Sequence, residues 1–272
     1  CPSLNRLFVR LRIMNQHSKN KVALVGISCS VIIVLFSIAH ASQSILYLDS
    51  WGLIKALPIT YIFGVISFSI FHLYIILNSK SYFINSACVL LLITILFGTA
   101  TLLEGTPRLE YAYKAGTNID YIVRNGYTCT DWSILDANSR FQYWPSVYYL
   151  SAAIVILSTI DINYLLLFTP IASQILYLFP LLLIFKKVLP EPKYIFVACS
   201  LFFLMNWVNQ DFLSNQNIGL FFSLLVLSIL ILIQFNMKYS KSWIILFLCT
   251  FFCVVISHGL SSIATLAYVL SF

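Results

Sequence analysis

Several stretches of this chain are long, apolar and free of charged side chains. Residues 83–103 and 164–185, for example, contain no Asp, Glu, Lys or Arg. About 20 such residues in a helix cross the roughly 30 Å hydrocarbon core of a bilayer. Helices are favoured over barrel strands, because strands would alternate polar and apolar residues in segments of about ten. These runs therefore predict a bundle of transmembrane helices.

Composition supports the same class of protein. The 272 residues are 60% hydrophobic and only 9% charged, and mean hydropathy is +0.92, whereas a soluble domain carries about 25% charged residues. We expect an all-α polytopic membrane protein with about eight transmembrane helices, plus juxtamembrane or re-entrant helices in a large outer loop. The predicted spans are residues 22–40, 56–77, 83–103, 164–185, 194–208, 218–235, 243–256 and a last one that begins near residue 263.

The two ends of the sequence suggest a piece of a longer protein. The chain begins at Cys1 and stops at Phe272 inside an apolar run, so we expect the C-terminus to be truncated. The basic start, the apolar run and Ala39-His40-Ala41 are similar to a secretory signal. However, the apolar core is long for a signal and further spans follow, so we favour an uncleaved anchor.

Lysine and arginine residues indicate which loops stay in the cytosol, because positively charged loops are retained inside during membrane insertion. A basic segment precedes the first span and places the N-terminus in the cytosol, and its leucines at helical spacing predict an interfacial helix. The only acid expected on that side is Glu191, so the net charge of +7 indicates contact with anionic lipids and argues against a nucleic-acid partner. The cations expected inside are Arg6, Arg10, Arg12, Lys19, Lys21, Lys80, Lys186, Lys187, Lys193, Lys238 and Lys241.

The same rule limits how the middle of the chain crosses the membrane. Three spans from a cytosolic start place residues 104–144 outside, whereas Lys186 and Lys187 favour the inside. The apolar stretch 145–160 is about 24 Å long as a helix, at 1.5 Å per residue, which is too short for a full span. We expect it to lie on or dip into the outer leaflet. The alternative is a true span that leaves both lysines outside.

This layout divides the chain into four parts and gathers its acids on the outer side. Residues 1–21 form a cytosolic basic interfacial segment and residues 22–103 three transmembrane helices; residues 104–163 form a large extracytoplasmic loop with juxtamembrane helices, and residues 164–272 the remaining transmembrane helices. The acids predicted outside are Asp49, Glu104, Glu110, Asp120, Asp131, Asp136, Asp161 and Asp211.

The large outer loop carries helix signals, and two further polar segments return to the same side. Thr106 and Pro107 are a good N-cap and first-turn pair, and residues 118–126 predict a helix with Asn at its start, Gly at its end and an apolar edge along the bilayer. Residues 206–217 bring amides, and residues 257–262 bring hydroxyls and a histidine. Such groups at the membrane boundary are costly unless they are buried in protein or line a wet cavity, so we predict that the three segments converge on one.

These polar segments together resemble a known family. The chain carries in order TPRLEYAY, IDYIVRNG, LDANSRFQYWP, NQDFLSNQ and SHGLSS, and over residues 104–262 it is similar to prokaryotic membrane proteins of the GT-C glycosyltransferase superfamily, relatives of the oligosaccharyl and protein-mannosyl transferases. In such relatives the aromatic run usually continues Trp-Pro-Gly and the later segment reads Ser-Pro-Gln, where this chain has Ser146 and Asn215. The resemblance implies a prokaryotic cell-membrane protein that uses a lipid-phosphate-linked sugar and an outer-face carboxylate.

The residue types needed for that chemistry are present. Sugar transfer from a polyprenyl phosphate needs a carboxylate for the acceptor's proton, cations beside the departing phosphate and polar groups for the sugar hydroxyls. Some relatives use a divalent metal such as Mg or Mn and others do not; this chain shows no metal-ligand motif. The candidate catalytic carboxylates are Glu104, Glu110 and Asp211; the candidate substrate-binding residues are Arg108, Asp120, Arg124, Asp136, Arg140, Trp144, Gln210, Gln216 and His258.

Each candidate also has an ordinary structural explanation. Charge pairs at helical spacing, such as Asp120 with Arg124 or Glu110 with Lys114, commonly stabilise exposed helices by a few tenths of a kcal/mol. His258 can be a polar residue at a helix end. Two rival functions remain open: a transporter or flippase of a lipid-linked glycan or other amphiphile, which would place charges or broken helices near mid-membrane, and a noncatalytic scaffold subunit.

Overall fold

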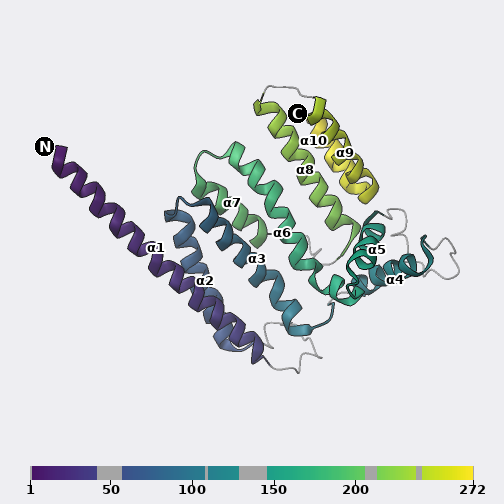
Figure 1. Ribbon diagram of the computed structural model, residues 1–272, viewed down its shortest axis with the longest axis horizontal. Coiled ribbons are helices and arrows are strands. Elements are labelled where there is room, and N and C mark those ends of the chain that lie inside the picture. Colours follow the sequence, from purple (N-terminus) through teal and green to yellow (C-terminus); the bar gives the residue numbers. More distant parts are fainter. Residues whose placement is uncertain are drawn as a thin grey trace.

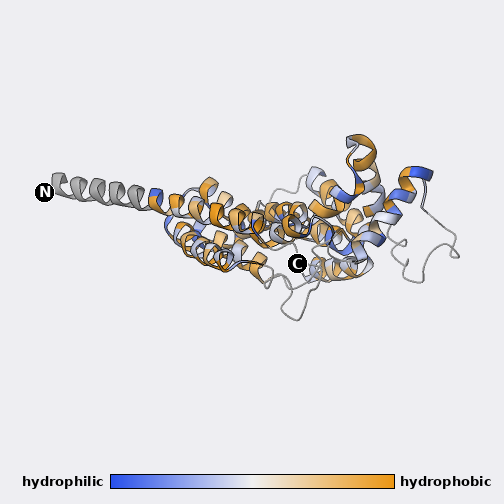
Figure 2. Cartoon of the chain, turned by 90° about the horizontal axis from the view of Figure 1, so that it is seen from below, coloured by the Kyte–Doolittle hydropathy of each residue, from blue (hydrophilic) through white to orange (hydrophobic). Residues whose placement is uncertain are grey.

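The computed structural model describes residues 2–41, 57–107, 110–128, 146–205, 213–236 and 241–271, with the backbone alone at residues 2–19, 110 and 236. Over these residues the chain is helical and contains no strand. The helices form a bundle that is mostly apolar. The helix α4 (Glu110–Asn125), at one end, carries many hydrophilic residues (Figures 1 and 2). The predicted all-α membrane class is confirmed at this level.

Within the residues that the structure describes, five helices are long and apolar enough to cross a membrane. Because each has an apolar surface nearly all the way round, lipid and neighbouring helices can both cover it. They correspond to five of the predicted spans. They are α1 (Pro2–Ala39, apolar over Asn20–Ala39), α2 (Ile59–Asn78), α3 (Tyr82–Glu104), α6 (Ile162–Val188) and α8 (Asn215–Asn236, apolar over Asn215–Phe235).

The other helices are shorter, so the predicted count of about eight spans is not confirmed. Three of them replace predicted spans: α7 (Pro192–Leu204), α9 (Lys241–Ser257) and α10 (Gly259–Ser271) have 13, 17 and 13 residues. The last helix therefore begins at Gly259, earlier than expected. The remaining two are α4 (Glu110–Asn125) and α5 (Ser146–Ser158), which falls in the apolar stretch predicted to be too short for a span.

Helix ends follow local signals where a side chain or a glycine supplies the cap. The predicted separation of the apolar stretch 145–160 from the span 164–185 is confirmed, because Asp161 is the N-cap of α6. Gly105 and Gly126 take left-handed φ values of 62° and 78° just after α3 and α4, a conformation that glycine adopts without steric cost. The predicted helix over residues 118–126 ends as expected but begins earlier, at Glu110.

Three expectations about surface helices are wrong in the structure. Thr106 does not start a helix; its hydroxyl lies 3.5 Å from the Glu104 carbonyl oxygen. The apolar edge of α4 does not lie along a bilayer, since Ile119 and Ile122 are 0% and 5% exposed in a core shared with α5 and α6. In the same way, the basic N-terminal segment is not a separate interfacial helix, because α1 continues through it without a break.

Candidate functional site

The two ends of the bundle differ in charge. One end of the bundle holds the end of α3, the helices α4 and α5, and the start of α6. The α2–α3 and α6–α7 turns lie at the opposite end (Figure 1). Lys186 belongs to that opposite end, where its Nζ lies 5.5 Å from the centre of the Tyr82 ring. The acids Asp120 and Asp161 belong to the first end. Asp120 and Asp161 are therefore separated from Lys186 by the length of the long apolar helices.

Two adjoining cavities open at the acidic end, between α4, the α5–α6 link and the start of α6. The larger has a volume of about 550 Å³ and the smaller about 420 Å³, within the range of about 300–1,000 Å³ that is usual for ligand sites. Both are lined by Tyr113, Asp161 and Asn163. The larger also contains Asp120, Gly116, Thr117 and Leu166, and the smaller Gly105, Thr106, Pro107, Tyr164 and Leu167.

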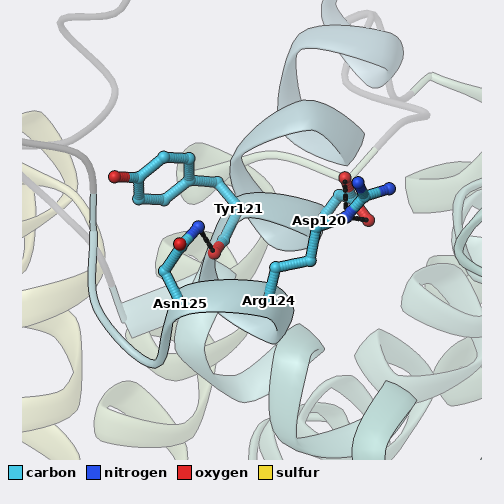
Figure 3. Close-up of polar contacts among 4 residues, drawn as sticks. All are labelled: Asp120, Tyr121, Arg124 and Asn125. Carbon is cyan, nitrogen blue, oxygen red and sulfur yellow. Dashed lines mark hydrogen bonds and ion pairs between the residues drawn. The ribbon is translucent and has the colours of Figure 1, made fainter.

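Asp120 comes from α4 and is held by the next turn of its own helix. The Arg124 guanidinium lies 2.8 Å from its Oδ2, and Arg124 Nε donates a hydrogen bond to Oδ1 over 3.0 Å (Figure 3). The predicted i,i+4 pair is thus confirmed. The side chains of Asp120 and Arg124 are 41% and 74% exposed, so the pair contributes little to stability. It does keep the Asp120 carboxylate oriented on the wall of the larger cavity.

Asp161 is held by a hydrogen bond to the backbone at the start of α6. One of its oxygens, Oδ1, accepts a hydrogen bond of 2.7 Å from the Asn163 backbone N–H at the start of α6. A carboxylate can accept further hydrogen bonds on its remaining lone pairs. Since Asp161 lines both cavities, it is positioned to contact groups in either one.

The backbone beside Asp161 adopts an unusual conformation. Thr159 has a φ of 56°, which is in the left-handed region and is uncommon for a β-branched residue. Nearby, α4 and α6 approach closely: a Cβ on Gly116 would lie 2.8 Å from Leu166 Cδ1. The glycine lets α6 approach α4 closely at Leu166 and Ile162, and the left-handed link leads into Ile160 and Asp161, which line the larger cavity.

The other described candidates lie at the same end but outside these cavities. Glu104 is the last residue of α3, is half-buried and has its Oε1 shielded from solvent. Gln216 is half-buried in the first turn of α8. His258 is a helix cap: its Nδ1 accepts the Ser261 backbone N–H over 3.2 Å, and its carbonyl oxygen accepts the Ser262 N–H over 3.1 Å. Within the described residues, the three polar segments share an end of the bundle, but only the first one lines the cavities.

Sequence reasoning missed a buried polar core between α5, α6 and α8. The Tyr177 hydroxyl donates to the Asn217 carbonyl oxygen over 2.7 Å and also meets Asn217 Oδ1, and Asn217 Nδ2 donates to Ser173 Oγ over 3.1 Å. Tyr148 shares a hydrogen bond with Asn215. The available signal was the spacing of four between Ser173 and Tyr177 within an apolar run. The side chains of Asn215 and Asn217 thus connect α8 to α5 and α6 by hydrogen bonds.

The remaining candidate residues lie outside the part of the chain whose side chains are described. Glu110 begins α4, but its side chain is not among those described. Their roles stay predictions. The others are Arg108, Asp136, Arg140, Trp144, Gln210 and Asp211.

Neither metal-ligand chemistry nor similarity to other proteins assigns the site. Across the described ranges, no group of three or more His, Cys, Asp or Glu side chains is arranged to hold a metal ion. No family model, curated protein sequence or solved structure matches the chain. The site is therefore defined by its own geometry.

Proposed function

We propose that the protein is a membrane-embedded glycosyltransferase that moves a sugar from a polyprenyl-phosphate-type lipid to an acceptor at the cavity-bearing end of the bundle, on the extracytoplasmic face. The observation that carries the proposal is the pair of adjoining cavities that share Asp161. A transferase must hold two substrates side by side with a catalytic group between them. Asp161 has that position, and apolar helices beside it can accommodate a lipid tail.

In the proposed reaction, Asp161 acts as the general base. It takes the proton from the acceptor hydroxyl or amide as that group attacks the anomeric carbon of the sugar. The bond between the anomeric carbon and the phosphate oxygen breaks, and its electron pair leaves with the lipid phosphate. A positioned base of this kind contributes about 10²–10⁴-fold to a rate.

The other acids have supporting roles in this proposal. Asp120, fixed by Arg124, accepts hydrogen bonds from hydroxyl groups of the substrate in the larger cavity. Glu104 directly precedes Gly105, which lines the smaller cavity, so it remains a candidate carboxylate for the donor side. The previously named Glu110 and Asp211 stay candidates of the same kind.

The course of α6 favours an enzyme over a transporter. Transporters commonly bind substrate where a helix is broken near mid-membrane. Here α6 continues through both Pro170 and Pro180, and the carbonyl oxygens of these prolines accept hydrogen bonds from Ser173 and Ser228 over 3.1 and 3.2 Å. Glu104 and Asp161 lie instead at helix ends.

The test is sugar transfer by membranes that contain Asp161→Asn. Asparagine is as good an N-cap as aspartate, so α6 keeps its start while the base is lost. With a short-chain polyprenyl phosphate that carries a radiolabelled hexose, we expect transfer to fall at least 100-fold, in line with loss of a general base. Glu191→Gln is the matched control, because it removes an acid at the opposite end, where Glu191 pairs with Lys193 over 2.9 Å.

Two results would contradict the proposal. One is full transfer by Asp161→Asn, which would remove the base. The other is transfer by the wild-type protein no greater than that of membranes lacking it, across glucose, mannose and galactose donors. Melting temperatures of both variants, measured in detergent, show whether a loss of transfer reflects chemistry or folding.

A further inference from the structure

The end of the bundle opposite the cavities brings two short turns together. The α2–α3 turn occupies residues 79–81 and the α6–α7 turn residues 189–191. The Tyr82 ring at the start of α3 lies 5.5 Å from the Phe196 ring of α7, measured between centroids, and 5.5 Å from Lys186 Nζ at the end of α6. Three helix ends therefore meet at one corner around Tyr82 (Figure 1).

This corner carries an excess of positive charge. Lys80 lies in the first turn, Lys186 and Lys187 precede the second, and Lys193 follows it. The one acid among these turn residues is Glu191, which pairs with Lys193 over 2.9 Å. The local balance is four cations against one acid, so an anion is favoured there.

The start of α7 adds to the attraction for an anion. Its N-cap, Glu191, makes no side-chain capping hydrogen bond, and Pro192 follows at the first position. Helix N-termini carry partial positive charge, although the Tyr194 and Ile195 N–H groups are already bonded to the Glu191 carbonyl oxygen.

The N-terminus of α3, beginning at Tyr82, lies at the same corner. The α3 start is capped by the Ser81 side chain, which accepts the Ile84 N–H over 3.4 Å. The side-chain cations and the partial positive charge of the two helix starts thus act together.

Large apolar side chains flank the cations. Phe83 is 83% exposed, Val188 57% and Leu77 50%. A soluble phosphate would leave these side chains uncovered, whereas acyl chains attached to a phosphate would cover them. Lysines above such surfaces extend their charged ends toward headgroups while their stems stay on apolar surface.

We propose that the corner formed by the α2–α3 turn, the end of α6 and the start of α7 is a specific binding site for the phosphate headgroup of an anionic phospholipid. Lys80 and Lys186 contact the phosphate, and the acyl chains lie along Leu77, Phe83 and Val188. The site is separate from the acidic cavities and does not depend on the glycosyltransferase proposal.

The test is titration of the purified protein in detergent with phosphatidylglycerol or phosphatidylcholine of identical acyl chains, with bound lipid counted by native mass spectrometry. We expect phosphatidylglycerol to bind more tightly than phosphatidylcholine to the wild type. Each of Lys80→Gln and Lys186→Gln should weaken phosphatidylglycerol binding about fivefold, as expected for one lysine near an anionic surface. Phosphatidylcholine binding should not change.

Controls separate this site from general attraction and from a soluble ligand. Lys241→Gln removes a lysine at the start of α9, outside the corner, and should leave the affinity unchanged. Phe83→Ser should weaken lipid binding, and inorganic phosphate at millimolar concentration should not displace the lipid. Unchanged affinity in a folded Lys80→Gln/Lys186→Gln variant, an equal loss in Lys241→Gln, or displacement by inorganic phosphate would each overturn the proposal.

Discussion

At the scale of single residues, His258 shows how a residue suited to catalysis can serve the fold. Its Nδ1 accepts the Ser261 backbone N–H, so the neutral ring carries its proton on Nε2. Nδ1 also lies 3.0 Å from the Ser261 hydroxyl. The nitrogen facing α10 is therefore already used to cap that helix. Sequence alone indicated a polar residue at a helix end but could not show which nitrogen would be engaged.

This capping role predicts how stability depends on pH. Burial lowers the pKa of His258 below its ordinary value of 6.5. Because the folded-state pKa is depressed, the contribution of the neutral ring is fully present above pH 6.5 and is lost as the pH falls through the folded-state pKa. The melting temperature of the wild type in detergent should therefore decrease as the pH is lowered below 6.5.

Variants at the same position separate the cap from other roles. His258→Ala should destabilise the protein by about 1 kcal/mol at pH 7.5, the usual cost of a lost N-cap, whereas His258→Asn should keep the cap and lose the pH dependence. Equal melting temperatures for His258→Ala and wild type at pH 7.5 would show that the cap does not matter.

At the scale of elements, the sequence was sufficient where a single helix determines its own ends or pairs. The start of α6 at Asp161, the end of α4 at Gly126 and the Asp120–Arg124 pair all depend on residues within four positions of one another. Local hydrogen bonds and backbone conformation fix such features. They could be predicted without knowing the neighbouring helices.

Features that depend on tertiary packing could not be predicted in this way. The apolar edge of α4 suits either a bilayer surface or a protein core, and only the positions of α5 and α6 decide between them. Likewise, both cavities need Tyr113 of α4 beside Asp161, a contact between residues far apart in the chain. The sequence placed Asp161 among the outer acids. It was not predicted as a site residue, because its position beside Tyr113 depends on that long-range contact.

The contact between α8 and α10 offers a test at the same scale. Small residues face each other there, and Thr265 Oγ1 donates to Ser223 Oγ over 2.8 Å. A Cβ on Gly219 would lie 2.8 Å from Ser261 Oγ and 3.0 Å from His258 Cβ. Small residues permit this close approach of helices in membranes.

Gly219→Ala should therefore destabilise the protein by about 1–3 kcal/mol through overpacking. Gly116→Ala is the matched control, because its new Cβ would meet the end of the Leu166 side chain, which can rotate away. Both variants gain the same helix propensity of about 1 kcal/mol. Unfolding by denaturant in detergent should give a lower free energy of unfolding for Gly219→Ala than for Gly116→Ala. The reverse order would show that α10 does not pack tightly on α8.

At the scale of the whole molecule, the lysine-rich corner and the two cavities lie at opposite ends of the same long helices. The corner around Lys186 and the cavities around Asp161 are separated by the length of α6, 27 residues, or about 40 Å at 1.5 Å per residue. This length exceeds the roughly 30 Å hydrocarbon core. A membrane around the bundle would therefore place Lys186 and Lys187 on one side and Asp120 and Asp161 on the other, and from the positive-inside tendency we expect these two lysines in the cytosol.

The orientation can be measured with two single cysteines in a variant whose seven native cysteines are replaced by serine or alanine. Thr117→Cys lies on the exposed wall of the larger cavity, and Lys187→Cys lies at the exposed end of α6. A membrane-impermeant maleimide added to intact cells should label Thr117→Cys at once and Lys187→Cys only after permeabilisation. The opposite pattern would place Asp120 and Asp161 in the cytosol, which would contradict an extracytoplasmic transferase and leave the lipid site to be tested against the outer leaflet.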